Sequence, residues 1–177
     1  MKKPLLLILL LFFVSLQAQE FTQVDSQTKI VFKIKNFGVN VDGDFSEIKI
    51  ETNFDSNQLE QSYLKATIAV KSIATGIESR DKHILEEDYF DESNHPNITL
   101  SSTQFQKNAN GTILMTANVT MKGITKRVEI PLIVRESEEK LTIQSNFEIN
   151  RKEFNIGGGS FVMGKLVRIQ VVYSGIQ

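Results

Sequence analysis

The 177-residue sequence contains no cysteine and no tryptophan, and it has only two histidines. Without cysteine the chain cannot form a disulfide, a zinc site of the His/Cys type or the thiol-linked anchor of a lipoprotein. Two histidines also make a His-carboxylate metal site an unfavourable reading. We therefore expect no metal and no cofactor, and a fold that is stabilised by packing alone.

A clear excess of one charge is also absent, since 20 basic residues stand against 21 acidic ones. Proteins that bind nucleic acid usually carry a clustered basic excess, so we expect no nucleic-acid partner. The glycine-containing segment 159–165 fits the start of a phosphate loop, but Leu166 replaces the Ser/Thr that would hold magnesium. No nucleophile elbow is present either. The sequence predicts a protein that is not an enzyme and has no catalytic residues.

The first residues have the layout of a secretory signal peptide. A short cationic start at 1–3 precedes an apolar run at 5–14, and small residues follow up to Ala18. The run is shorter than the roughly 20 residues that span a bilayer, so an uncleaved anchor is the weaker reading. We expect a signal peptide at 1–18 and one periplasmic or secreted domain at 19–177. No later segment predicts a transmembrane span in the mature chain.

Alternation of apolar and polar residues dominates the rest of the chain. This period of two is typical of antiparallel strands with one face in water. Between Phe45 and Ile48 the parity slips, which predicts a bulge. We count about eight strands, and closure into a barrel would remove their free edges. A two-sheet sandwich fits the alternation almost as well. The alternating segments are 29–35, 64–71, 128–134, 141–149 and 167–173.

The polar segment 74–102 interrupts this pattern. Within it, apolar residues recur at helical intervals from Ile77 to Tyr89, which predicts a short helix there. Such a helix between two strands would either cover one end of a barrel as a lid or serve as a plain connector that plugs the end.

Ordered motifs in the same segment resemble the YceI-like family of exported polyisoprenoid-binding proteins. The family pattern runs approximately R-D-x-H-L, then D-F-F-D, then P, and it is matched here at 80–84, 88–91 and Pro96. Ile84 stands where Leu is usual, His95 where an aromatic residue commonly precedes the proline, and Asn155 where Gly usually follows Phe. Further matches lie at 41–46, 121–126 and 151–154.

The resemblance implies an all-β fold, an antiparallel eight-stranded extended lipocalin-like barrel with a short helix after the third or fourth strand. Its interior would hold a long isoprenoid or acyl chain as the partner. Burial contributes about 0.8 kcal/mol per CH₂, so a long tail needs no specific polar contact. The alternative is that the phenylalanines simply form a solid core. The predicted pocket residues are Phe32, Phe45, Ile68, Phe90, Val128, Ile130, Phe147, Phe154, Phe161 and Ile169.

Two polar residues are candidates for the mouth of the pocket. Arg80 and His83 would donate to a phosphate or quinone oxygen. In the alternative reading Arg80 is buried and ion-paired with Asp81 or Asp91, and Pro96 sets an extended entry into the next strand. The residues assigned to a structural motif are Asp81, Asp88, Asp91, Pro96 and Arg151.

Two functions therefore fit the sequence. The first is an exported, non-enzymatic protein that binds an isoprenoid lipid, a quinone or a fatty-acid derivative in the barrel interior. The alternative is an exported interaction or stress-response module with a filled barrel and no lipid ligand. The sequence leaves open which lipid is bound, which partner delivers it and whether the protein forms a homodimer.

Overall fold

The computed structural model describes residues 20–177, so the predicted signal peptide at 1–18 lies outside the described residues. The helical segments are α1 (Glu78–Ile84) and three short 3-10 helices, η1 (Asp25–Gln27), η2 (Val70–Ser72) and η3 (Arg151–Phe154). The strands are β1 (Thr22–Gln23), β2 (Lys29–Asn36), β3 (Val39–Phe45), β4 (Ile48–Thr52), β5 (Leu64–Ala69), β6 (Ile73–Ala74), β7 (Asn97–Lys107), β8 (Ile113–Met121), β9 (Ile124–Glu136), β10 (Lys140–Asn150) and β11 (Met163–Ile176).

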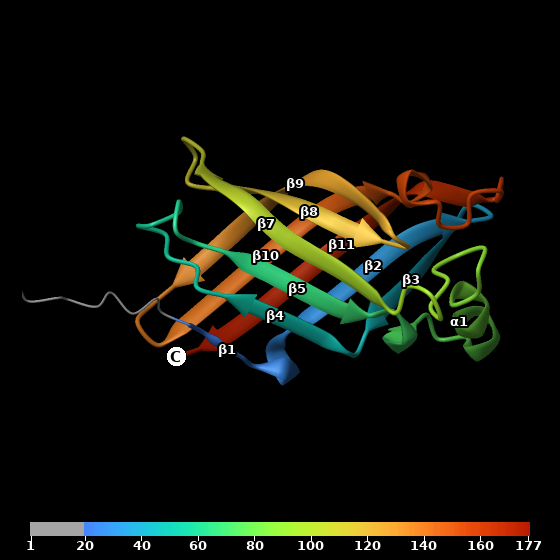
Figure 1. The fold of residues 1–177 in the computed structure, drawn as a ribbon, viewed down its shortest axis with the longest axis horizontal. Coiled ribbons are helices and arrows are strands. Elements are labelled where there is room, and N and C mark those ends of the chain that lie inside the picture. The colour runs from blue at the N-terminus through green and yellow to red at the C-terminus, as the bar shows by residue number, and fades with distance from the viewer. Residues whose placement is uncertain (1–19) are drawn as a thin grey trace, which may run out of the picture.

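All these strands belong to one antiparallel sheet. Its order is β4-β5-β7-β8-β9-β10-β11-β2-β3-β6, and β1 pairs with β11. The sheet curls into an elongated half-barrel, with α1 at one end and the C-terminus near the other (Figure 1). The predicted all-β antiparallel class is confirmed.

The predicted count of eight strands is wrong, because the described residues form eleven. Two long segments are each broken in two, β3 from β4 and β5 from β6, and β1 is an additional short strand. At the break the amide of Ser46 donates to the carbonyl of Ser72 at 3.2 Å, and the amide of Ala69 donates to the carbonyl of Glu47 at 3.0 Å. The slip in alternation after Phe45 falls at this break.

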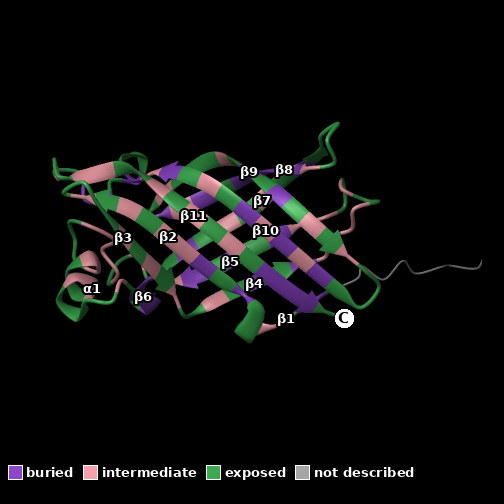
Figure 2. Cartoon of the chain, turned by 180° about the vertical axis from the view of Figure 1, so that it is seen from behind, coloured by how far each residue is buried: buried purple, intermediate pink, exposed green. Residues whose placement is uncertain are grey.

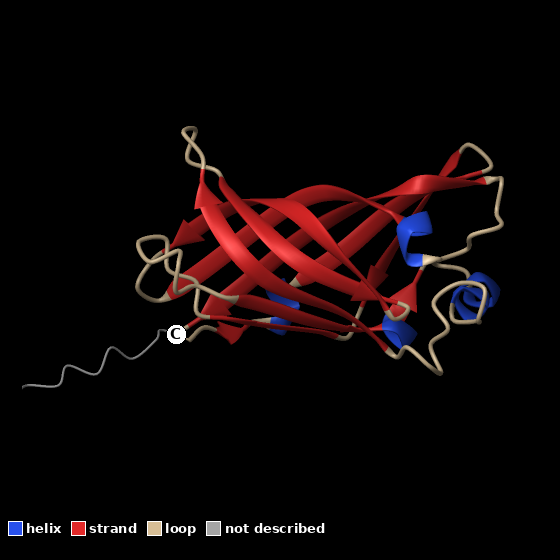
Figure 3. Ribbon diagram, turned by 45° about the horizontal axis from the view of Figure 1, so that its top comes forward, coloured by secondary structure: helices blue, strands red, loops and turns tan. Residues whose placement is uncertain are grey.

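The helix also differs from its prediction. It follows β6, not the third or fourth strand, and it covers Glu78–Ile84 where 77–89 was expected. The amides of Leu85 and Glu86 bond to carbonyls three residues earlier, at 3.2 Å each, which tightens the chain into turns and ends the helix. None of the helices described between residues 20 and 177 is long and apolar enough to cross a membrane. Figure 3 shows α1 at one end of the curled sheet, beside and not among its strands.

Gln23 links the edge strand β4 to β1 and so to β11, which lies in the interior of the strand order. Its side-chain amide donates to the carbonyl of Ile48 at 2.8 Å and accepts from the amide of Ile50 at 2.7 Å. Gln23 itself lies in β1, opposite Gly175 of β11. One side chain thus satisfies backbone groups of β4 that an edge strand would leave unpaired.

The core is solid at the end far from α1. There Phe54 and Phe105 meet edge to face with ring centroids 5.5 Å apart. Leu141 and Tyr173 are fully buried in the same cluster. Figure 2 shows the end of β11 near the C-terminus buried, whereas β3 near α1 is intermediate or exposed. Packing therefore loosens toward the α1 end on the side of β3, whereas a second buried cluster that includes Val70 and Phe154 packs against Tyr89 and Phe90.

Candidate functional site: an apolar cavity

A cavity of about 210 Å³ lies inside the curled sheet. Its wall is built from β2–β11 and the segment after α1, and it consists mainly of isoleucine, valine, phenylalanine, leucine and methionine side chains. Engineered apolar cavities of about 150 Å³ stay dry and bind small aromatic ligands, whereas pockets for drug-sized ligands measure about 300–1,000 Å³. A long chain would therefore enter fully only if wall side chains move apart.

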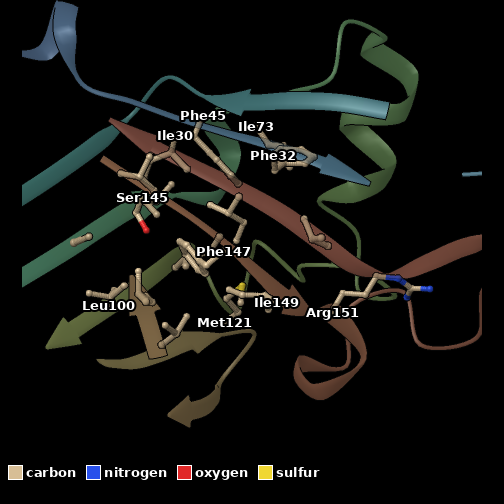
Figure 4. A pocket seen from close by; sticks show the side chains of 18 of the residues that line it. Ile30, Phe32, Phe45, Ile73, Leu100, Met121, Ser145, Phe147, Ile149 and Arg151 are labelled. Atoms are coloured by element: carbon tan, nitrogen blue, oxygen red, sulfur yellow. The ribbon is translucent and has the colours of Figure 1, made fainter. Parts of the chain in front are cut away.

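The register of four strands explains how one row of the wall forms. Phe147 of β10 lies opposite Ile169 of β11, which lies opposite Phe32 of β2. Phe32 in turn lies opposite Gly43 of β3. Since side chains alternate between the two faces of a sheet, all four positions point into the same interior. Figure 4 shows Phe32 and Phe147 among the side chains around the cavity.

The cavity is open toward α1 and closed at the opposite end. Val167, Ile169 and Val171 share one face of β11 and line the cavity, yet each is only partly buried. Tyr173, the next residue on that face, is 1% exposed. Inward side chains near α1 thus border open space, whereas Tyr173 belongs to the solid core.

The segment after α1 forms one side of the opening. Ile84, Tyr89 and Phe90 contribute to the cavity wall, and the amide of Phe90 donates to the carbonyl of Ile84 at 3.1 Å. The amide of Gly157 donates to the carbonyl of Asp88 at 2.9 Å. This bond ties the segment to the loop that precedes β11.

Arg151 lies at the same end and is 3% exposed. Figure 4 shows its guanidinium directed away from the labelled apolar side chains. Burial lowers the pKa of Arg151, and the charge of Tyr89 acts in the opposite direction. No ion pair joins Arg151 to a carboxylate within the described chain. Its partners are the carbonyls of Ile156, Gly157, Ser160, Met163 and Gly164.

Ser145, another polar residue of the wall, also has a hydrogen-bond partner. The buried hydroxyl of Ser145 donates to the carbonyl of Pro131 at 2.7 Å. Across residues 20–177 every buried side-chain nitrogen or oxygen has a hydrogen-bond partner. Nowhere in this range do three or more His, Asp or Glu side chains gather in a way suited to a metal ion. The cavity therefore offers apolar contact.

Seven of the ten residues predicted for the pocket line the cavity; they are Phe32, Phe45, Ile68, Phe90, Ile130, Phe147 and Ile169. Three do not. Phe161 is 101% exposed, because it lies in the loop before β11 and not on a strand. Phe154 is buried beside Val70 and Ile98 at the end of η3, so it belongs to the core. Val128 lies opposite Ala117 and packs against both core clusters, outside the wall.

Neither residue predicted for the polar mouth lines the cavity. Arg80 donates from Nε to the hydroxyl of Thr75 and from a terminal nitrogen to the carbonyl of Thr75, both at 2.7 Å. It is partly exposed and forms no ion pair with a described carboxylate, so the ion-paired reading of Arg80 is wrong, and it lies outside the cavity wall. His83 is exposed and bonds to Glu86 at 2.9 Å. The His83 ring meets the ring of Tyr89, a residue of the wall, edge to face with centroids 4.9 Å apart, so His83 lies behind the wall and not in it.

The residues of the structural motif organise the segment around α1. Asp81 accepts from the amide and the hydroxyl of Thr75. Asp91 has a φ of 52° and accepts from the side-chain amide of Asn94 at 2.9 Å. Asp88 contributes its carbonyl to the bond with Gly157 described above. Pro96 directly precedes β7, and its carbonyl accepts from Val70 at 2.8 Å.

Sequence reasoning missed several residues of the wall. Ile30 and Ile34 share the parity of Phe32, so the alternation contained the signal that identifies them. Tyr89 was assigned to the helix and not to the cavity. The carbonyl partners of Arg151 had no signal in the sequence, because backbone carbonyls carry no residue identity.

The family model of the YceI-like domain matches residues 21–174 of this chain. A UPF0312 protein of Ectopseudomonas mendocina is 33% identical over 100 residues, which are 56% of this chain. The match spans 52%, about half, of that relative's length.

Two solved structures share the fold. The crystal structure of Burkholderia cenocepacia BcnA superposes with a TM-score of 0.82 at 22% identity, covering 86% of this chain and 99% of that one. A polyisoprenoid binding domain from Saccharophagus degradans, implicated in plant cell wall breakdown, gives a TM-score of 0.71 at 13% identity. It covers 90% of this chain and 99% of that chain.

Proposed function

Because the chain belongs to the YceI-like family, we propose that it is an exported, non-enzymatic protein that holds the long chain of an isoprenoid or similar amphiphile inside the curled sheet. The observation that carries the proposal is the apolar cavity of about 210 Å³. The description of the Saccharophagus degradans neighbour as a polyisoprenoid binding domain supports the same ligand class. The cavity favours this proposal over the alternative function, which requires a filled interior.

The direction of binding follows from the packing. The far end is blocked by Tyr173 and the Phe54–Phe105 pair, so a chain enters beside α1 with its apolar tip toward Tyr173. The donors of Arg151 and the hydroxyl of Ser145 are already used. Affinity then comes from burial of methylenes and methyls, and the head group stays at the α1 end.

Two measurements test this function. Native mass spectrometry of protein purified from its own host should detect a retained lipid mass. The stripped protein should then bind prenyl alcohols of increasing length, with affinity rising as more carbon is buried, by about 0.8 kcal/mol per CH₂ at most. Absence of a lipid mass together with absence of prenyl alcohol binding would favour the alternative interaction module.

A matched pair of variants locates the ligand. Ile169 faces the cavity, whereas its neighbour Gln170 is exposed on the outer face of β11. Ile169→Trp fills part of the cavity and should weaken binding of a prenyl alcohol at least about tenfold, which corresponds to about 1.4 kcal/mol. Gln170→Trp should bind as the parent does. Equal affinities for the two variants would place the ligand elsewhere.

Export is tested separately. The cationic start, apolar run and small residues of 1–18 support cleavage after Ala18. The full chain produced in its own host should therefore yield a mature protein whose sequence begins at Gln19. A mature protein that retains residues 5–14 would contradict this part of the proposal.

A further inference from the structure

Five apolar side chains are exposed on two loops and on two adjoining strands, β3 and β11, at the α1 end of the sheet. Phe37 and Val39 are 76% and 68% exposed, and Phe161 is 101% exposed. Val162 and Leu166 are 44% and 46% exposed. We call these five residues the rim patch. Single exposed apolar residues are ordinary, but a contiguous group marks an interaction surface.

The two loops of the rim patch are held together by backbone contacts. The amide of Phe37 donates to the carbonyl of Val162 at 3.0 Å. Next to this bond, Asn36 of β2 lies opposite Met163 of β11. In Figure 1 both loops lie at the end of the sheet that carries α1. The patch is therefore one surface and not scattered residues.

Phe37 occupies a backbone conformation that disfavours it. Its φ is 50° and that of Gly38 is 79°. Tight hairpin turns with two positive φ values prefer Asn-Gly, and a bulky residue at the first position is strained. Phe37 gains little from packing, since most of its surface is exposed. The fold therefore does not account for an aromatic residue here, whereas insertion into an apolar medium does.

The charges around the rim patch indicate what it contacts. Residues 34–41 and 155–167 contain Lys35 and Lys165 and no acidic residue. Neither lysine forms an ion pair with a described carboxylate. Apolar side chains flanked by lysines suit the surface of an anionic bilayer, where the lysines meet phosphates and the rings enter the acyl boundary. A second copy of the patch would present the same positive charge and repel it.

The rim patch adjoins the opening of the cavity. Ile34 and Met163 both line the cavity, and they lie within a few residues of Phe37 and Phe161 along the chain. A Cβ at Gly157 would lie 2.7 Å from the end of Met163 and 2.9 Å from the ring of Tyr89, so this loop packs on the segment after α1.

We propose that the rim patch docks the protein on the surface of an anionic phospholipid bilayer. Docking there turns the opening beside α1 toward the membrane, which is the source or the destination of a long-chain ligand. The purpose of docking rests on the proposed function, but the docking itself is measurable without any ligand.

The absence of tryptophan provides a direct test, because any introduced tryptophan is the sole indole of the chain. Phe161→Trp places it in the rim patch. Ile133→Trp is the matched control, because Ile133 is 55% exposed on β9 but lies away from the rim patch. Ile133 lies opposite Gln144 of β10, whereas Leu166 of the patch lies opposite Asn150, six residues further along β10. When vesicles of equimolar phosphatidylcholine and phosphatidylglycerol are added, the tryptophan fluorescence emission of Phe161→Trp should shift to shorter wavelength, and added salt should reduce this blue shift. Ile133→Trp should show none.

A second measurement uses substitutions that remove the surface. The double variant Phe37→Ser/Phe161→Ser should lose at least about tenfold in vesicle binding at an unchanged melting temperature, because exposed rings contribute little to folding. Lys35→Gln and Lys165→Gln should each weaken binding about fivefold, as expected for one lysine near an anionic surface. Ile133→Ser should change neither quantity.

Three outcomes overturn the docking. They are no blue shift for Phe161→Trp, an equal shift for Ile133→Trp, or a dimer in sedimentation that Phe37→Ser/Phe161→Ser dissolves while vesicles bind neither form. Failure of the two proposals is distinguishable. If the protein binds prenyl alcohols but not vesicles, only the docking proposal fails. If it binds vesicles but no prenyl alcohol, only the proposed ligand fails.

Discussion

The ring of Phe32 lies directly over Gly43, its neighbour across β2 and β3. A Cβ at Gly43 would lie 2.3 Å from Cζ of Phe32 and 2.8 Å from the carbonyl oxygen of Ala74. Both distances are much shorter than a van der Waals contact, so a side chain at position 43 would clash. The ring also packs at a tilt against Phe45, with centroids 5.7 Å apart. The glycine therefore lets the Phe32 ring lie along the wall.

Gly43→Ala should destabilise the protein by about 1–3 kcal/mol, because the added methyl forces the Phe32 ring or the backbone to shift. Urea denaturation would measure the change in the free energy of unfolding. The double variant Gly43→Ala/Phe32→Leu should recover part of the loss, since the contact with Ala74 persists. The control is Gly158→Ala, where a Cβ meets nothing within 4 Å, and it should stay within about 0.5 kcal/mol of the parent.

Arg151 should be required for the loop before β11. Arg151→Met leaves several buried carbonyls without a donor, so we expect a loss of about 3 kcal/mol or more in the free energy of unfolding. Arg151→Lys retains three donors and should lose less. Limited proteolysis should cut Arg151→Met within residues 157–162 faster than the parent.

The matched control for Arg151 is Arg168→Met. Arg168 pairs with Glu148 at 2.9 Å on the exposed surface, and such pairs contribute at most about 1 kcal/mol. Similar losses for the two variants would mean that the carbonyl bonds of Arg151 do not stabilise the fold. An uncut loop in Arg151→Met would lead to the same conclusion.

The alternation of residues predicts the inner face but not whether the interior is hollow. Val171 and Tyr173 occupy equivalent places in the pattern of β11 and both line the cavity, yet Val171 is only partly buried and Tyr173 is packed in the core. The difference arises from what faces them across the sheet. At the far end Phe54 and Phe105 supply large rings, and their meeting depends on the curl of the whole sheet.

Loops limited the prediction of the site in a different way. Phe161 was taken as inward by analogy with strand residues, but the preceding glycines leave its segment without a strand period. In one of its two readings Arg80 pairs with a carboxylate, but its partner in the structure is Thr75. That contact is set by the turn between β6 and α1, whose geometry no periodic pattern encodes.

Thr75 should therefore matter more than the charge of Arg80. Its hydroxyl accepts from Arg80 and donates to Asp81, so Thr75→Val removes both bonds. Arg80 and Asp81 are partly exposed, so water replaces part of the loss and we expect a cost of about 1–2 kcal/mol. Arg80→Met should cost a similar amount and leave the affinity for prenyl alcohols unchanged.

Lys82→Met is the control on the same helix. Lys82 pairs with Glu78 at 2.7 Å on the exposed side of α1, and such a pair contributes about 0.5 kcal/mol or less. If Arg80→Met instead weakened prenyl alcohol binding at unchanged stability, Arg80 would be a head-group ligand and its assignment to the turn would be wrong.

Tyr173 should make the fold sensitive to alkaline pH. Burial raises the pKa of Tyr173 above its ordinary value of 10.0, whereas the unfolded chain keeps the ordinary value. Its contribution to stability is therefore complete below about pH 10 and is lost as pH rises toward the folded pKa, because only the unfolded state releases the proton readily.

Tyr173→Phe keeps the ring and loses a long hydrogen bond of 3.4 Å to the carbonyl of Phe21. At neutral pH the variant should be less stable by about 1 kcal/mol. Urea denaturation at rising pH should show this difference shrinking and then reversing above about pH 10. Parallel losses of stability in the two proteins throughout that range would mean that Tyr173 ionises in the folded state as easily as in water.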